Sequence, residues 1–442
     1  MRHQFISIRI LILAVFTLVS FSIYPQNKNS KPFPMEKSPW QKIRKERIQK
    51  LLPEAMKVAE VDSWIVICRE NSNDPLAMHV GGENAGGTAA FMFFLIGDKV
   101  KTVAISPVGE DVALKDKNLH DEVIVIERGS NIWGTVAKEL IKANPAKIAI
   151  NSGGYTVADG LSHSQYKQLE TAFGEELMKK VVPSTSLVME WLSIKLPEEI
   201  EIMKKAAEIT DQMERDAFKI IIPNKTKDSD VGMFLKKRMA ELGVTDGWQP
   251  DQNPNVNSGS DRGHSNATEK IIRPGDVIQL DFGIKVYDVW CSDIQRFAYV
   301  LKPGEKDAPE NIKNYFNWAV QGHKKVLEAL KPGSTGYDAD KAQRDWMNEK
   351  GSLPVMWGTG HPVGYWAHDA GPSLSGGTRP ARPANAKVLK VGQVFAYDGF
   401  YSWKLDEKNN KTISVEEMVE VTPTGGKYMN KTQDELILIK SK

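Results

Sequence analysis

The sequence has 442 residues, 41% of them hydrophobic and 26% charged, and its 58 basic and 56 acidic side chains leave a formal net charge of +2. This balance gives no electrostatic reason to expect nucleic acid or a stable membrane partner. The length exceeds that of an ordinary single domain and allows two or three.

The first 24 residues have the pattern of an export signal. Arg2, His3 and Arg9 precede an apolar run at 10–24, which is short for a membrane span of about 20 apolar residues. We therefore expect export to the periplasm or the medium. An uncleaved membrane anchor is the alternative, because no Ala-x-Ala motif follows the run.

Residues 38–190 predict an α/β domain with a mixed sheet. Short apolar runs that alternate with helical patterns are typical of such domains. We expect helices at 38–56, 131–144 and 163–174, and strands at 63–68, 89–96, 100–105, 122–126 and 147–150. Few ionisable residues cluster in this region, so its expected role is scaffolding, oligomer contact or one wall of a site.

The pattern changes near residue 190, where we place a domain boundary. Pro197, Glu198 and Glu199 indicate a helix start, because proline and acidic side chains suit the first turn. Further helices are expected at 225–242, 309–330 and 337–350, within otherwise strand-rich sequence. The second domain is expected to span 191–430.

The chain contains two cysteines, Cys68 and Cys291, too few for a disulfide framework. Each lies in an apolar run, so we expect buried free thiols. A single bridge between them is the alternative.

Two aspartates occupy neighbouring strand ends in the second region. Asp281 ends an apolar run, and Asp293 enters the next run twelve residues later. Asp-x-Gly is by itself a common turn, and Asp288 between the two is expected to be a solvated loop residue. If the strands pair, however, the two carboxylates lie side by side and repel each other unless they share a proton or a cation.

One histidine and two further acids extend this set. His361 lies in a glycine-rich stretch, and taken alone it is equally a buried structural histidine. Asp398 ends another apolar run, whereas Glu416 and Glu417 interrupt one, and only one of these two can face a site because strand side chains alternate. Oxygen ligands with one imidazole suit Mn²⁺, Co²⁺, Fe²⁺ or Zn²⁺, and paired ions could be bridged by carboxylates. A structural calcium site is the alternative, against which the histidine counts.

The order Asp281, Asp293, His361, Asp398 and Glu416 resembles that of the pita-bread metallopeptidases, which include aminopeptidase P, prolidase and methionine aminopeptidase. The resemblance covers about residues 190–425, and the region before it is similar to the creatinase-like domain of aminopeptidase P and prolidase. It implies a catalytic domain with a curved antiparallel sheet and flanking helices. It also implies that the five residues hold one or two divalent ions, with manganese favoured.

The resemblance implies a reaction as well. His264 and His368 match histidines that contact the substrate, and Glu416 would take part in proton handling. The implied activity is hydrolysis of Xaa-Pro peptide bonds by a metal-activated hydroxide, on peptides with proline at the second position. A homodimer is a common assembly in the family.

Three departures from the family pattern concern the site. The interval between Asp281 and Asp293 is one residue longer than usual, which predicts a bulge or an altered loop. Asp398 replaces a glutamate and reaches about 1.5 Å less far, so we expect a strand shift, which Gly399 in place of proline would permit, or weaker binding of one ion. Ser414 replaces an arginine, which changes how the polar end of a substrate is anchored.

These departures keep two alternatives open. The first is a non-peptidase hydrolase or lyase on the same fold, including a metal-free creatinase-like enzyme. The second is a metal-impaired homologue that binds a partner without catalysis. Retention of an oxygen or nitrogen donor at all five positions favours the peptidase.

Overall fold

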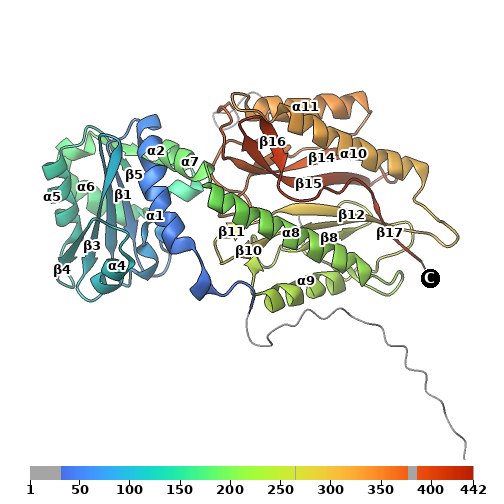
Figure 1. Ribbon diagram of the computed structural model, residues 1–442, viewed down its shortest axis with the longest axis horizontal. Coiled ribbons are helices and arrows are strands. Elements are labelled where there is room, and N and C mark those ends of the chain that lie inside the picture. The colour runs from blue at the N-terminus through green and yellow to red at the C-terminus, as the bar shows by residue number, and fades with distance from the viewer. Residues whose placement is uncertain (1–30, 264, 377–385, 442) are drawn as a thin grey trace, which may run out of the picture.

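The computed structural model describes residues 31–263, 265–376 and 386–441. Two large sheets lie on either side of the segment that leads into helix α8 (Figure 1). Residues 1–24, the predicted export signal, and His264 lie outside the described residues. Among the described helices, none combines the length and the apolar character that a membrane crossing requires.

The first sheet is mixed, as predicted, with the strand order β4-β3-β2-β1-β5-β6. Strand β1 pairs antiparallel with β2 and parallel with β5, and every residue of β1 is buried. The strands are β1 (Ser63–Cys68), β2 (Ala89–Ile96), β3 (Lys99–Pro107), β4 (Glu122–Ile126), β5 (Ile148–Ile150) and β6 (Val181–Pro183). The short helices and turns around it are η1 (Met35–Lys37), α3 (Ala77–Val80), η2 (Gly82–Asn84), α4 (Asp111–Lys117) and η3 (Thr156–Ala158). The longer ones are α1 (Trp40–Lys50), α2 (Leu52–Val58), α5 (Ile132–Ala143), α6 (His163–Met178) and α7 (Thr185–Ser193).

The single helix expected at 38–56 is divided into α1 and α2. Pro53 lies in the first turn of α2, where its missing N–H costs no hydrogen bond, whereas inside a continuous helix it would remove one. The sequence prediction was therefore wrong about continuity at this point, although both segments are helical.

The second sheet is curved and contains eight strands, of which six follow the order β13-β14-β15-β12-β9-β8, with β16 beside β15 and β17 beside β12. All pairs are antiparallel except that of β12 with β17. The strands are β8 (Asn255–Ser258), β9 (Val277–Phe282), β12 (Ile294–Val300), β13 (Gly360–Pro362), β14 (Val394–Lys404), β15 (Asn410–Thr422), β16 (Gly425–Tyr428) and β17 (Ile437–Ile439).

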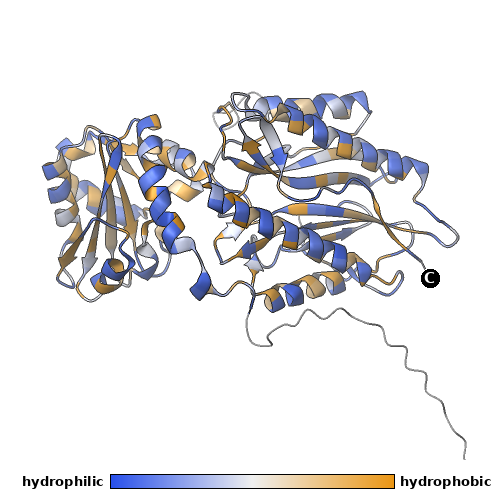
Figure 2. Ribbon diagram, in the orientation of Figure 1, coloured by the Kyte–Doolittle hydropathy of each residue, from blue (hydrophilic) through white to orange (hydrophobic). Residues whose placement is uncertain are grey.

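Four helices flank this sheet in two pairs. Helices α8 (Pro197–Lys219) and α9 (Asp228–Leu242) pack beside β12 and β8, and α10 (Glu310–Ala329) and α11 (Gly336–Glu349) pack on β14. In Figure 2 hydrophobic and hydrophilic residues alternate along these helices, as expected for helices with one buried face. Helix α8 begins at Pro197, as predicted, and the Glu199 side chain accepts a hydrogen bond from the Leu196 N–H at 2.9 Å.

A separate small sheet takes up the residues between Asp281 and Asp293. It consists of β7 (Thr245–Asp246), β10 (Ile284–Val286) and β11 (Trp290–Cys291). The turn between β10 and β11 places Tyr287 and Asp288 at φ 56° and 55°. Asp288 is exposed there and accepts a hydrogen bond from the Thr245 hydroxyl, which confirms it as a loop residue. The connection therefore leaves the pairing of β9 with β12 undisturbed.

A fully buried set of charges connects α1 to the segment that carries His361 and His368. We call Arg47, Lys195, Glu199 and Asp369 the linker charge cluster. Arg47 donates to Glu199 at 2.6 Å, and Lys195 lies 3.1 Å from Asp369. Tyr365, which is 1% exposed, donates its hydroxyl to Glu199 at 2.5 Å. Tyr365 is thus a core residue.

The two cysteines, Cys68 and Cys291, are free and buried, as predicted. Burial raises the pKa of both thiols, so neither is disposed to act as a nucleophile.

Candidate metal centre and active site

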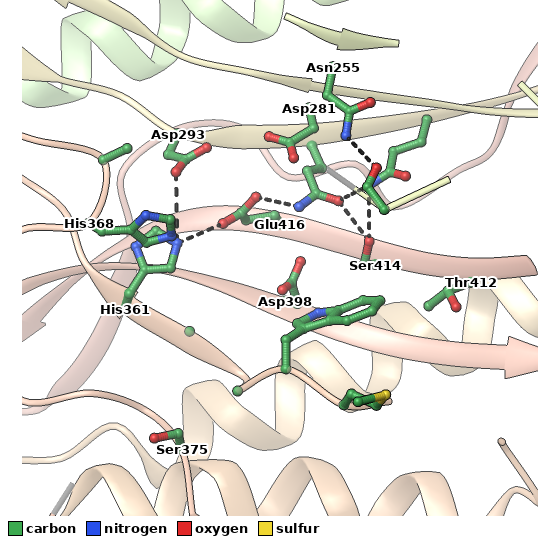
Figure 3. A pocket seen from close by; sticks show the side chains of 18 of the residues that line it. Asn255, Asp281, Asp293, His361, His368, Ser375, Asp398, Thr412, Ser414 and Glu416 are labelled. Atoms are coloured by element: carbon green, nitrogen blue, oxygen red, sulfur yellow. Dashed lines mark hydrogen bonds and ion pairs between the residues drawn. The ribbon is translucent and has the colours of Figure 1, made fainter. Parts of the chain in front are cut away.

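Strand register places three acids and one glutamine in a row across the curved sheet. Asp281 pairs with Gln295, Gln295 with Glu416, and Glu416 with Asp398. Directly paired residues on neighbouring strands have their side chains on the same face. The row formed by Asp281, Gln295, Glu416 and Asp398 is called the acid row below, and Figure 3 shows its three acids around one cavity.

Asp293 and His361 lie one pleat away on the same face. Asp293 precedes Gln295 by two residues, and His361 pairs with Ala396, which precedes Asp398 by two. Because side chains alternate along a strand, both therefore face the cavity. All five predicted metal ligands thus share one face of the sheet.

Three of the five come close enough to hold one ion together. Among the described residues, ligand atoms of Asp293, His361 and Glu416 lie within 4.8 Å of one another. His361 Nε2 is 3.8 Å from Asp293 Oδ2 and 3.7 Å from Glu416 Oε1 (Figure 3). Asp281 and Asp398 face the same cavity but lie outside this group.

The hydrogen bond of the His361 ring fits the role of a ligand. Its Nδ1 lies 3.3 Å from the Pro362 carbonyl oxygen, which can only accept, so Nδ1 carries the proton. In the neutral ring the lone pair of Nε2 then points toward two carboxylates. A backbone carbonyl that fixes the tautomer in this way is typical of metal-ligating histidines.

The electrostatics of the acids also fit a bound cation. Burial raises the pKa of Asp293 and of Asp398 well above the ordinary value, and the neighbouring carboxylates raise both further. Within the described part of the chain, Oδ1 of each has no hydrogen-bond partner although it is buried. Such a set is costly without a cation, and oxygen donors with one imidazole suit a divalent transition metal.

The cavity above the sheet has a volume of about 680 Å³. The exposed side chain of His368 lines it, and the rings of His361 and His368 lie 4.1 Å apart. His368 is thus beside the three-residue group without belonging to it. Trp248, Met356 and Trp357 supply apolar wall. The seventh predicted site residue, His264, lies outside the described residues.

Sequence reasoning missed two polar residues of this face, Gln279 and Gln295. Both line the cavity, and Gln295 Nε2 donates to Glu416 Oε2 at 2.7 Å. Strand alternation could have indicated them, since Gln279 precedes Asp281 by two residues and Gln295 follows Asp293 by two. Ser414, noted as a departure, donates to Gln295 Oε1 at 2.7 Å.

A curved antiparallel sheet that presents clustered carboxylates and an imidazole to one cavity defines a metalloenzyme of the pita-bread type. Residues 201–423, half of the chain, match the family described as "Metallopeptidase family M24". The chain belongs to this family and is a metallopeptidase. The resemblance and the fold expected from the order of the acids are thereby confirmed.

Individual relatives agree with this assignment. An Xaa-Pro dipeptidase of Pyrococcus furiosus is 28% identical over 281 residues, which cover 63% of this chain and 73% of the relative. An Xaa-Pro dipeptidase of Pyrococcus horikoshii is 25% identical over 401 residues, 89% of this chain and 99% of the relative.

Solved structures share the fold over most of both chains. An Xaa-Pro dipeptidase from Bacillus anthracis has a TM-score of 0.67 at 23% identity, covering 90% of this chain and 100% of that one. An X-Pro aminopeptidase from Thermotoga maritima has a TM-score of 0.66 at 21% identity, covering 87% and 100%.

Proposed function

We propose that the protein is an exported, metal-dependent peptidase that hydrolyses Xaa-Pro peptide bonds. The observation that carries the proposal is the convergence of Asp293, His361 and Glu416 on one point of an acid-lined cavity. Membership of family M24 and the Xaa-Pro activity in the names of the relatives supply the substrate class. Export rests on the basic start and apolar run of residues 1–24.

Each residue of the site has a distinct role in this proposal. Asp293, His361 and Glu416 would hold the ion, of which manganese is the favoured candidate, with Asp281 and Asp398 adding negative charge. A divalent ion in such a site lowers the pKa of a bound water molecule and polarises the scissile carbonyl. His368 lines the cavity beside His361, and in this proposal it would donate a hydrogen bond to the substrate carbonyl and stabilise the developing oxyanion. In this proposal Glu416 would also accept and return a proton near the cleaved bond.

The walls of the cavity suit the proposed substrate. Trp248, Met356 and Trp357 offer apolar surface, against which a proline ring can be buried without loss of a hydrogen bond, since proline nitrogen has no N–H in a peptide. A peptide with proline at its second position would place that ring next to the bond to be cleaved.

The test is an assay of purified protein that has been stripped of metal and reloaded with Mn²⁺, Co²⁺ or Zn²⁺. Xaa-Pro dipeptides and Xaa-Pro tripeptides are compared with the same peptides carrying alanine in place of proline. We expect turnover of proline peptides only in the presence of metal. His361→Ala should abolish it, whereas His163→Ala, which changes an exposed histidine at the start of α6, should not. Absence of turnover with every metal and both peptide lengths would overturn the proposal.

Export is tested separately by cell fractionation and N-terminal sequencing. Recovery of a chain that begins near residue 25 outside the cytoplasm is expected. A full-length chain in the membrane fraction would indicate an uncleaved anchor, and a full-length cytoplasmic chain would contradict export.

A further inference from the structure

Gln295 lies inside the acid row, between two carboxylates that a second ion would have to share. It pairs with Asp281 on one neighbouring strand and with Glu416 on the other. Adjacent strands are about 4.8 Å apart, so two strand spacings separate the backbones of Asp281 and Glu416. The side chain of Gln295 projects from the strand between them, on the same face.

The hydrogen bonds of Gln295 fix which end of its amide faces Glu416. Its Nε2 donates to Glu416 Oε2 at 2.7 Å, and an ionised carboxylate can only accept. Its Oε1 accepts from Gln279 Nε2 at 2.6 Å and from the Ser414 hydroxyl at 2.7 Å. Rotation of the amide by 180° would set oxygen against carboxylate, so the NH₂ group is held toward Glu416.

The two oxygens of Glu416 therefore have different neighbours. Oε1 faces His361 Nε2 at 3.7 Å, within the three-residue group. Oε2 is occupied by the amide of Gln295. A carboxylate that bridges two ions uses both of its oxygens or shares one of them, and an amide N–H with partial positive charge competes with the second ion for Oε2.

The geometry points to a centre that binds a single divalent ion through Asp293, His361 and Glu416, with Gln295 excluding a second ion between Glu416 and Asp281. This inference rests on the metal centre of the proposed function. Ser414 and Gln279 assist by holding the Gln295 oxygen away from the acids. Asp281 then remains on the cavity face outside the group of three ligands.

The test counts ions and does not depend on turnover. Metal-free protein is titrated with Mn²⁺, bound manganese is measured by mass spectrometry after removal of the free ion, and electron paramagnetic resonance distinguishes isolated from spin-coupled manganese. We expect one ion per chain with an uncoupled signal in the unaltered protein. Gln295→Ala and Gln295→Thr should each double the bound manganese and produce a spin-coupled signal. Gln252→Ala, which changes another glutamine of the same cavity, should leave one ion.

The possible outcomes separate the inference from the proposal on which it rests. Two coupled ions in the unaltered protein would overturn the inference and leave the metallopeptidase proposal standing. One ion in both the unaltered protein and the two Gln295 variants would overturn the role of Gln295. No bound ion under any condition would contradict the metal centre itself. The titration of the unaltered protein decides the number of ions even if a variant fails to fold.

Discussion

Strands β12 and β15 present two opposite solutions to buried charge, one on each face. On the cavity side, Asp293 directly before β12 and Glu416 on β15 gather with Asp281 and Asp398. On the other face Arg296 donates to both oxygens of Glu417, at 3.1 and 2.9 Å, and to Asp211 at 2.6 Å. Glu416 and Glu417 are neighbours in sequence, and the prediction that only one of them faces the site is confirmed.

The two faces differ in whether a buried acid has a cationic partner within the chain. This difference distinguishes a structural acid from a candidate metal ligand. Glu417 has an arginine of this chain as its partner, so its charge is balanced as soon as the protein folds. Asp293 and Asp398 crowd against other acids, and their pKa values rise because of burial and like charge. Folding brings these acids together at a cost, and a cation from solution would relieve it.

The largest effects are expected from replacing Glu416 and Glu417 one at a time. Glu417→Ala leaves Arg296 without its principal buried partner and should cost about 3–5 kcal/mol of unfolding free energy. Glu416→Gln keeps the shape but removes a charge from the acid row, so the metal-free protein should be as stable as before or more so, with turnover lost. Urea unfolding and peptide hydrolysis measure the two effects. Loss of stability in Glu416→Gln equal to that in Glu417→Ala would contradict the distinction.

The linker charge cluster is a second set of buried charges that are paired within the chain, like Arg296 and Glu417. Tyr365→Phe removes the hydroxyl that donates to Glu199, and a hydrogen bond to a buried charged group contributes about 1.5–3 kcal/mol. We expect a lower midpoint of urea unfolding with nearly unchanged turnover per folded molecule. A large fall in turnover at full stability would show instead that this cluster acts on the reaction.

Asp398→Glu tests whether the side chain at position 398 can reach the ion. The added methylene restores about 1.5 Å of reach toward the three-residue group. A new ligand oxygen should tighten Mn²⁺ binding by about tenfold, equivalent to about 1.4 kcal/mol. Isothermal titration calorimetry of the metal-free protein measures the change, and Asp398→Asn is the control that should bind no more tightly than the unaltered chain. Unchanged affinity in Asp398→Glu would mean that position 398 does not approach the ion.

A pH-dependent effect is expected for Glu214, a buried acid on α8. It is fully buried, and neither carboxylate oxygen has a hydrogen-bond partner among the described residues. Burial raises its pKa well above the ordinary 4.5. Between pH 4.5 and the raised pKa of the folded protein, Glu214 is ionised in the unfolded chain but protonated in the folded chain. The contribution of this group to stability is therefore full below pH 4.5 and declines as the pH rises.

Glu214→Gln removes this contribution to the pH dependence. Its unfolding free energy should exceed that of the unaltered protein by a margin that grows with pH, at up to about 1.4 kcal/mol per pH unit. Urea unfolding from pH 4.5 to 8 measures the margin. A margin that stays constant over this range would show that Glu214 is ionised in the folded protein.

Local patterns predicted the longer helices except α7, most of the longer strands and the five candidate ligands, because apolar periodicity and strand-end acids are visible in short windows. They did not reveal Gln295 as a partner of Glu416, since the two are 121 residues apart and meet only through strand register. The same holds for Arg47 and Glu199, 152 residues apart. Pro53 divided a helix that periodicity alone had predicted to be continuous. The domain boundary near residue 190 and the roles of the site residues stay predictions.

The most direct measurement follows hydrolysis of an Xaa-Pro dipeptide and bound manganese in the same samples during reloading of metal-free protein. We expect no turnover without metal and a rise in proportion to bound manganese that ends at one ion per chain. Turnover that is already complete in metal-free protein would contradict the proposal that hydrolysis needs a cation held by Asp293, His361 and Glu416.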